Sequence, residues 1–221
     1  MEQYDAYAKH VDKLLDWFAK EWMFADVVTS SIVRDLLIVF KVLDDKIDNK
    51  QMTQTSILQK LSTDEPYNIH EVDSVYQEKL HRVMEHVKQV GTYNDFMIYL
   101  KKLILLTYAK KDIADIHTYI QKHYLECLVS GKVIGTCYGA GYERGEALYR
   151  RIGVIGLLDS ALDLKKDSFN GETALRGTYA ERVQLACAAY TKYNKLRRPS
   201  DKWFGMYLKK LLSLPQYFNK S

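Results

Sequence analysis

Proline and glycine are scarce in this sequence, with three Pro and 11 Gly among 221 residues. Both residue types favour turns and end helices, so their scarcity excludes a collagen-like or low-complexity chain and disfavours an all-β protein. The three cysteines, Cys127, Cys137 and Cys187, are odd in number and include no CxxC pair. Their spacing argues against a disulfide framework and against a structural zinc site, and it predicts a reducing compartment.

Long apolar runs are also absent, because no window reaches the roughly 18 apolar residues that a membrane-spanning helix needs. The N-terminal stretch MEQYDAYAKHVDKLLDW carries a charge every few residues and has no apolar signal region. The net charge is only +4, and the Lys-rich stretches all have acidic neighbours, which argues against nucleic-acid binding. We therefore expect a soluble, cytoplasmic protein.

Apolar residues recur every three to four positions through most of the chain, a spacing that predicts amphipathic helices. The clearest run is DVVTSSIVRDLLIVFKVLDDKID at 26–48, with Thr29 or Ser30 as the expected N-cap. Further helices are expected over residues 72–90, 96–110, 113–138, 146–167, 180–196 and 203–212. Because no repeat and no long linker interrupts the pattern, residues 1–221 are predicted to form a single all-α domain.

Two groups of aspartates lie on strongly apolar predicted helices. LDDKID places three of them at i, i+1 and i+4, and GLLDSALDLKKD places three at i, i+4 and i+8: Asp44, Asp45, Asp48, Asp159, Asp163 and Asp167. Either group alone is typical of the solvated end of a helix. Like charges one turn apart repel by a few tenths of a kcal/mol, and we expect no interleaved basic residue to relieve either stripe.

A divalent cation would turn this repulsion into attraction, and Mg²⁺ prefers the oxygens of carboxylates and phosphates. A diphosphate bridged by such ions becomes a good leaving group. The two aspartate groups together therefore predict a site for Mg²⁺ and a diphosphate, with all six carboxylates as metal ligands and Asp44, Asp48, Asp159 and Asp163 as the catalytic ones.

These motifs resemble those of the trans-isoprenoid synthase superfamily, most closely its squalene/phytoene synthase branch. KVLDDKID resembles the first Asp motif of that branch, DSALD followed by Asp167 and Gly171 resembles the second, and CYGAG at 137–141 is similar to a segment upstream of it. The resemblance implies a helical bundle around a central apolar cavity. It also implies that the two motifs face each other across three Mg²⁺ ions, with a C10 to C20 prenyl diphosphate as the substrate.

The chain departs from that branch in two places. LLDWFAKEW stands where the branch has a Ser-rich segment that grips diphosphate, and Ile155 and Leu158 stand where it has Asn and Arg. These departures favour a class I terpene synthase, which cyclises or eliminates one substrate, and the spacing of the second motif is also similar to that of class I terpene cyclases. The alternatives are a squalene/phytoene-type head-to-head prenyltransferase and a non-catalytic isoprenoid-synthase-like subunit.

Basic and aromatic side chains would complete such a site. The expected contacts to diphosphate are Lys41, Arg151 and Lys132, because cations pair with phosphate oxygens. Lys41 is equally well spaced for an intrahelical pair with Asp45. The expected cavity aromatics, whose rings can stabilise a carbocation, are Phe18, Trp22, Phe40 and Tyr138; core packing would explain any one of them as well.

Two further features have simpler interpretations. Glu78 and His81 give a single Glu-x-x-His, whereas a di-iron helix bundle needs one on each of two helices. The C-terminal run WFGMYLKKLLSLPQYF is expected to close the bundle, and a transient contact with a membrane surface is its alternative use. The sequence leaves the oligomeric state open.

Overall fold

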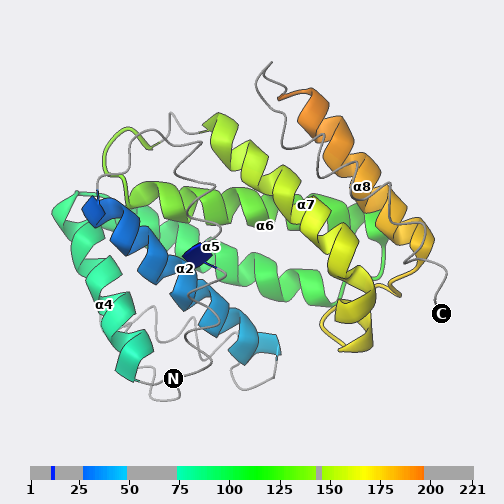
Figure 1. Cartoon of the computed structure of the whole chain (residues 1–221), viewed down its shortest axis with the longest axis horizontal. Coiled ribbons are helices and arrows are strands. Elements are labelled where there is room, and N and C mark those ends of the chain that lie inside the picture. The colour runs from blue at the N-terminus through cyan, green and yellow to red at the C-terminus, as the bar shows by residue number, and fades with distance from the viewer. Residues whose placement is uncertain (1–10, 13–26, 49–73, 143–145, 197–221) are drawn as a thin grey trace. The chain divides into compact units, whose positions relative to one another are not determined.

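The regular secondary structure of the chain is helical throughout the residues that the computed structural model describes, which are 11–12, 27–48, 74–142 and 146–196. The helices are α2 (Val27–Asp48), α4 (Ser74–Gln89), α5 (Tyr93–Lys111), α6 (Ile116–Thr136), α7 (Glu146–Phe169) and α8 (Tyr179–Asn194) (Figure 1). The all-α prediction is confirmed for this part of the chain. The helix expected at 203–212 lies outside the described residues.

The helix bounds agree with those expected from the sequence to within about three residues. One expected cap is wrong, because α2 begins at Val27 and so includes both Thr29 and Ser30. The apolar pattern already starts at Val27 and Val28, and the helix extends with it. Thr29 is buried inside the helix instead of capping it.

Glycines in a left-handed conformation end two of the helices. Gly91 follows α4 with φ 76° and Gly171 follows α7 with φ 71°. After α7, the Gly171 N–H donates to the carbonyl of Ser168 and the Glu172 N–H donates to that of Asp167. This pair of bonds is a Schellman motif, and it brings Glu172 back beside the last turn of α7.

The helices divide between two compact units. The first comprises Met1–Leu105 and Val129–Leu148, and the second Leu106–Leu128 and Tyr149–Ser221, so α5 and α6 contribute to both. In the first unit α2 packs against α4. The buried carboxylate of Asp35 on α2 forms two ion pairs with α4, one with Lys79 Nζ at 2.7 Å and one with Arg82 Nη1 at 2.9 Å. The predictions of one domain and of a central apolar cavity stay predictions.

The second unit has its core among α6, α7 and α8. Buried side chains from these helices include Tyr119, Leu157, Leu158, Leu164, Leu185 and Ala189. Gly153 and Gly156 allow α6 to approach α7 closely, since a Cβ atom at either position would clash with the side chain of Tyr124 or Cys127. In this unit α7 and α8 lie side by side (Figure 1). None of the helices in the described ranges is long and apolar enough to cross a membrane.

Candidate functional site

The first aspartate motif lies at the C-terminal end of α2. Lys41 reaches both of its described carboxylates, with Nζ 3.4 Å from Asp44 Oδ2 and 3.1 Å from Asp45 Oδ1. Lys41 precedes the motif and is not interleaved with its aspartates, but the i+3 and i+4 spacing places it beside both carboxylates, so it offsets part of their repulsion. Asp48 is the last residue of α2, and its side chain lies outside the described part of the structure.

Lys41 is held as a cation by this pairing. Its partial burial alone would lower the pKa of its ammonium group, but the carboxylates of Asp44 and Asp45 outweigh burial and raise the pKa above its ordinary value. The intrahelical pair expected from the sequence is thus present. A contact between Lys41 and diphosphate stays a prediction.

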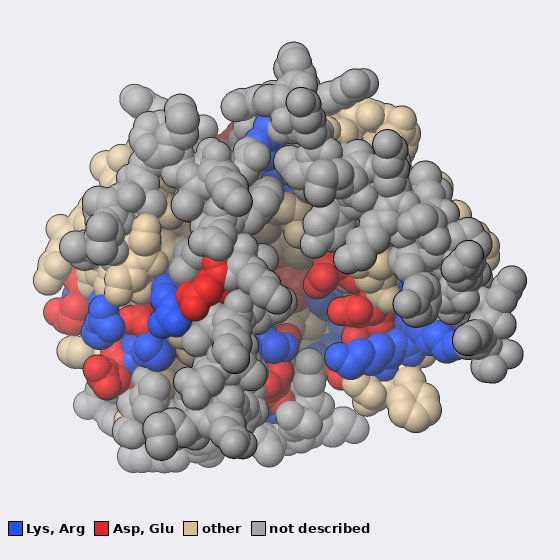
Figure 2. All heavy atoms as spheres, in the orientation of Figure 1, with Lys and Arg blue, Asp and Glu red and all other residues tan. Residues whose placement is uncertain are grey.

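The second aspartate motif runs along α7. Asp159 and Asp163 are exposed and Asp167 is half-buried. Figure 2 shows acidic and basic side chains next to each other over the C-terminal half of this helix, where Lys165 and Lys166 follow Asp163. The i, i+4 spacing places the three carboxylates on one side of α7.

Asp167 has the most strongly perturbed carboxylate of this motif. Burial is the largest cause that raises its pKa, and the negative charges of Glu172 and Asp163 raise it further. Lys166 and Lys110 lower it in part, and the resulting pKa is about 6. Glu172 is close because the Schellman motif folds the chain back at Gly171. The last turn of α7 is therefore a place where negative charge is destabilised and a cation would be stabilised.

The two motifs belong to different units, Asp44 and Asp45 to the first and Asp159, Asp163 and Asp167 to the second. Their approach to one another across Mg²⁺ ions stays a prediction. Within the described ranges, no three His, Cys, Asp or Glu side chains are arranged to hold a metal ion by themselves.

The other predicted diphosphate contacts lie in different surroundings. Lys132 is on α6, with Nζ 5.4 Å from the centre of the Tyr99 ring, an arrangement typical of a cation–π contact. Arg151 is buried on α7. Contact of either residue with diphosphate stays a prediction.

The predicted cavity aromatics are only partly described. Phe40 is half-buried on α2, and Tyr138 is half-buried in the turn that follows α6. Phe18 and Trp22 lie outside the described residues. The role of these four rings in a substrate cavity stays a prediction.

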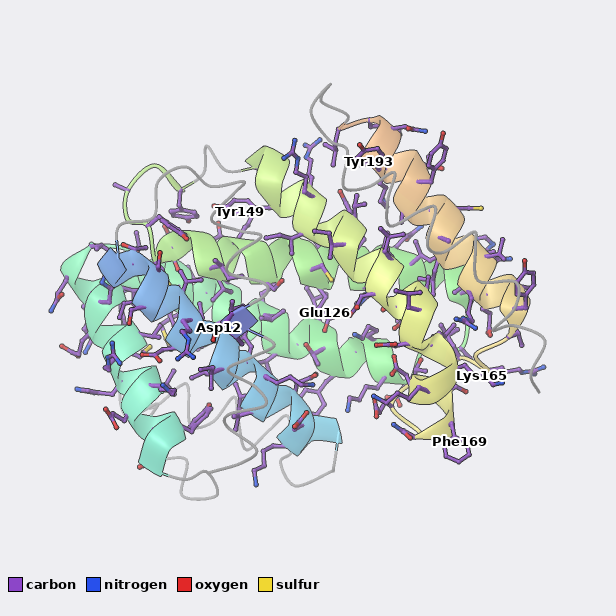
Figure 3. All side chains as sticks on the ribbon, in the orientation of Figure 1. Asp12, Glu126, Tyr149, Lys165, Phe169 and Tyr193 are labelled. Atoms are coloured by element: carbon purple, nitrogen blue, oxygen red, sulfur yellow. The ribbon has the colours of Figure 1, made fainter. Side chains whose placement is uncertain are left out.

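The structure also contains a buried polar cluster that the sequence did not predict (Figure 3). Its centre is the carboxylate of Glu126 on α6. One oxygen, Oε1, accepts a hydrogen bond from the Thr107 hydroxyl at 2.7 Å. The other, Oε2, lies 2.7 Å from Lys110 Nζ and 2.9 Å from His123 Nδ1. Burial would raise the pKa of Glu126, but Lys110 and His123 outweigh it and hold the pKa well below its usual range.

His123 faces hydrogen-bond acceptors with both ring nitrogens. Nδ1 lies 2.9 Å from Glu126 Oε2 and 3.3 Å from Lys110 Nζ, while Nε2 lies 3.1 Å from the Gly156 carbonyl oxygen and 2.8 Å from Ser160 Oγ. The Gly156 carbonyl can only accept, so Nε2 carries a hydrogen and donates it to that oxygen. Burial and the nearby Lys110 act to lower the pKa of His123, but its interactions with Cys127 and Glu126 outweigh them and raise the pKa well above its ordinary value.

The contacts run from Ser160 to His123 and from His123 to Glu126, as they do in the catalytic triad of a serine hydrolase. These three residues nevertheless cannot carry out the reaction of a triad. The His123 ring cannot accept the proton of Ser160 at Nε2, because Nε2 already donates a hydrogen bond to the Gly156 carbonyl. Ser160 is also inside α7, where backbone N–H groups are used within the helix and cannot form an oxyanion hole. The cluster is therefore an ion network that joins α5, α6 and α7.

A sequence signal for this cluster exists on α6. Glu126 is seven residues after Tyr119 and His123 is four after it, so both share the helical face of a buried tyrosine. A histidine and a glutamate on an apolar stripe indicate buried partners. The partners Lys110 and Ser160 come from other helices and give no such local signal.

Comparisons of this chain with protein-family models, with curated proteins and with solved structures gave no match.

Proposed function

We propose that this protein is a Mg²⁺-dependent class I isoprenoid synthase that ionises one prenyl diphosphate and cyclises it or eliminates a proton. The observation that supports this most is the stack of carboxylates at Asp159, Asp163 and Asp167, which ends beside Glu172 on the last turn of α7. At the end of this stack Asp163 and Glu172 both add negative charge beside Asp167, which Lys166 and Lys110 offset only in part, and a bound cation would relieve the repulsion that remains.

The donor set suits Mg²⁺ in one particular way. This ion is usually held by one or two carboxylates, with the remaining positions filled by water and by substrate phosphates. Exposed carboxylates at Asp159 and Asp163 fit that pattern, and the absence of a closed group of three protein ligands in the described residues is compatible with it. When bound, Mg²⁺ would neutralise negative charge on the departing diphosphate.

The chain's own residues would hold and orient the substrate. Asp159, Asp163 and Asp167 would bind the cation from α7, and Asp44 and Asp45 from α2, while Lys41 supplies a permanent positive charge next to the first motif. The substrate class of this proposal is a C10 to C20 prenyl diphosphate. The three cysteines are free, which is compatible with the cytoplasmic location that we also propose.

Addition of Mg²⁺ together with inorganic diphosphate is expected to raise the melting temperature of the wild-type protein. A ligand at about 100 times its dissociation constant adds roughly 2.7 kcal/mol to the free energy of unfolding. In a chain of this length each kcal/mol raises the midpoint by about 2–4 °C. Differential scanning fluorimetry with Mg²⁺ alone, diphosphate alone and both together measures the effect.

Asp163→Asn should abolish this stabilisation, because it removes one ligand charge while keeping the shape of the side chain. Asp112→Asn is the matched control, since Asp112 is an exposed aspartate in the turn after α5. That control should keep the full shift. An unchanged melting curve for the wild type in Mg²⁺ and diphosphate would contradict the proposed site.

A further inference from the structure

The exposed side of α8 carries no charge. Eight of its residues are exposed, and all are neutral: Tyr179, Ala180, Val183, Gln184, Cys187, Tyr190, Thr191 and Asn194. The tyrosines are 63% and 46% exposed and Val183 is 39% exposed. A surface helix ordinarily turns its charged residues toward water. On this helix the exposed side has the composition of a contact surface, which we call the α8 face.

The charged side chains of α8 are used within the second unit instead. Arg182 donates hydrogen bonds to the carbonyl oxygens of Ala161 and Leu162 on α7, at 2.8 and 3.1 Å. Lys192 lies over the ring of Tyr124 on α6, with Nζ 3.8 Å from the ring centre.

Glu181, the third charged residue of α8, completes a capping box at the start of the helix. It accepts a hydrogen bond from the Thr178 N–H, while the Thr178 hydroxyl accepts one from the Glu181 N–H. All three charges of the helix are therefore committed away from the α8 face.

The apolar members of this face form one continuous stripe. At 100° per residue, Tyr179, Val183, Cys187 and Tyr190 fall within an arc of about 80°. Phe169, at the end of α7, is also 91% exposed, and it points away from the helices (Figure 3). Four of the six large exposed hydrophobic residues in the described part of the chain lie on α8 or at this end of α7. Contiguous apolar surface of this kind marks interaction sites.

We propose that the α8 face pairs with the α8 face of a second copy of this chain, with the two helices antiparallel about a two-fold axis. Cys187 is near the middle of α8, so the axis would pass close to it and bring the two Cys187 thiols together. The same register sets Tyr190 of each copy against the smaller Val183 and Gln184 of the other. Tyr179 then lies opposite Lys195, which directly follows α8, and close to Thr191 and Asn194. Large residues thus oppose small ones, as an isologous interface requires.

Charge and size both favour a second copy as the occupant. A face that pairs with itself brings identical charges together, and the α8 face has none to repel. An acidic or basic partner would find no opposite charge there. Each aromatic side chain can bury about 150–250 Å² when it is fully exposed beforehand, so the eight partly exposed residues of the α8 face together would bury at most roughly 800–1,000 Å² across the two copies. That area lies at the low end of specific interfaces, in the range of weak and transient complexes.

Sedimentation velocity of the full chain, from about 1 to 200 µM, tests this interface. We expect a monomer–dimer equilibrium in the wild type and at least a 10-fold weaker one in Tyr190→Lys, which places like charges at the two-fold interface. Ile98→Lys is the matched control, because Ile98 is 61% exposed on α5 and should leave dimerisation unchanged. Circular dichroism of each variant checks that its helices are retained.

Thiol cross-linking locates the contact. The oxidant diamide takes two electrons and two protons from a pair of thiols and joins their sulfur atoms, so it should produce a covalent dimer on a non-reducing gel. Cys187→Ser should prevent this product.

The proposal is overturned if the wild type stays monomeric throughout the concentration range, or if dimerisation is as strong in Tyr190→Lys as in the wild type. It is also overturned if Cys187 resists maleimide in the monomer, which would mean that the chain's own residues 197–221 cover the face. None of these three results bears on the proposed isoprenoid activity, which rests on other residues.

Discussion

Glu126→Gln is expected to lower the free energy of unfolding by about 3–5 kcal/mol, the typical cost of removing one partner from a buried ion pair. The substitution keeps the size of the side chain and removes the carboxylate that pairs with Lys110 and bonds to His123, so the buried Lys110 cation would lose its counter-charge. Denaturant unfolding followed by circular dichroism measures the change. The expected loss is a large fraction of the 5–15 kcal/mol that stabilises a typical domain.

Glu85→Gln is the matched control for this prediction. Glu85 pairs with Lys88 at 2.9 Å, as Glu126 pairs with Lys110 at 2.7 Å, but its side chain is 44% exposed. An exposed pair of this kind contributes about 0–1 kcal/mol. Equal effects of the two substitutions would show that the Glu126 cluster is not an essential ion network.

The same cluster predicts how stability depends on pH. Folding lowers the pKa of Glu126 below its ordinary value of 4.5, so its contribution is present above that value. The contribution is lost as the pH falls below 4.5 toward the folded-state pKa. In Glu126→Gln this part of the acid dependence should disappear.

Asp163→Ala is expected to abolish turnover of a prenyl diphosphate and leave the helices intact. Asp163 is exposed, so truncating it creates no cavity. The loss of its charge also relieves repulsion with Asp167, which contributes to the raised pKa of that residue. The melting temperature in the absence of ligand should therefore stay the same or rise slightly. Kinetics of diphosphate release and a thermal melt of the same sample measure the two effects.

Asp112→Ala should retain wild-type turnover, since Asp112 is exposed outside both aspartate motifs. If Asp163→Ala turned over substrate at the wild-type rate, the second motif would be removed from the proposed site. If instead it unfolded the protein, Asp163 would have a structural role that its exposure does not indicate.

The helices could be predicted from the sequence because their information is local. The apolar spacing along residues 26–48 and the glycines at 91 and 171 determine where a helix extends and where it ends, and the observed bounds follow them closely. The error at Thr29 arose because a good capping residue also fits inside a helix whose apolar pattern begins before it. The i, i+4 spacing of Lys41 and Asp45 also predicted their ion pair, which the structure contains.

The buried cluster could not be predicted in this way, since its members come from three helices. Lys110 and Ser160 are 50 residues apart in the sequence, and each is unremarkable among its neighbours. Their partnership with His123 and Glu126 depends on how α5, α6 and α7 pack. Glycines 153 and 156 contribute to that packing by allowing α6 close to α7, which spacing along one helix does not reveal.

Incubation of the purified protein with C10, C15 and C20 prenyl diphosphates, with and without Mg²⁺, tests the central proposal most directly. Extracts are analysed by gas chromatography with mass spectrometry, and released diphosphate is measured in the same reactions. The proposal predicts Mg²⁺-dependent release of diphosphate and a product with the same number of carbons as its substrate. A product with twice that number would contradict the single-substrate reaction, and no diphosphate release from any of the three substrates would contradict the isoprenoid synthase proposal itself.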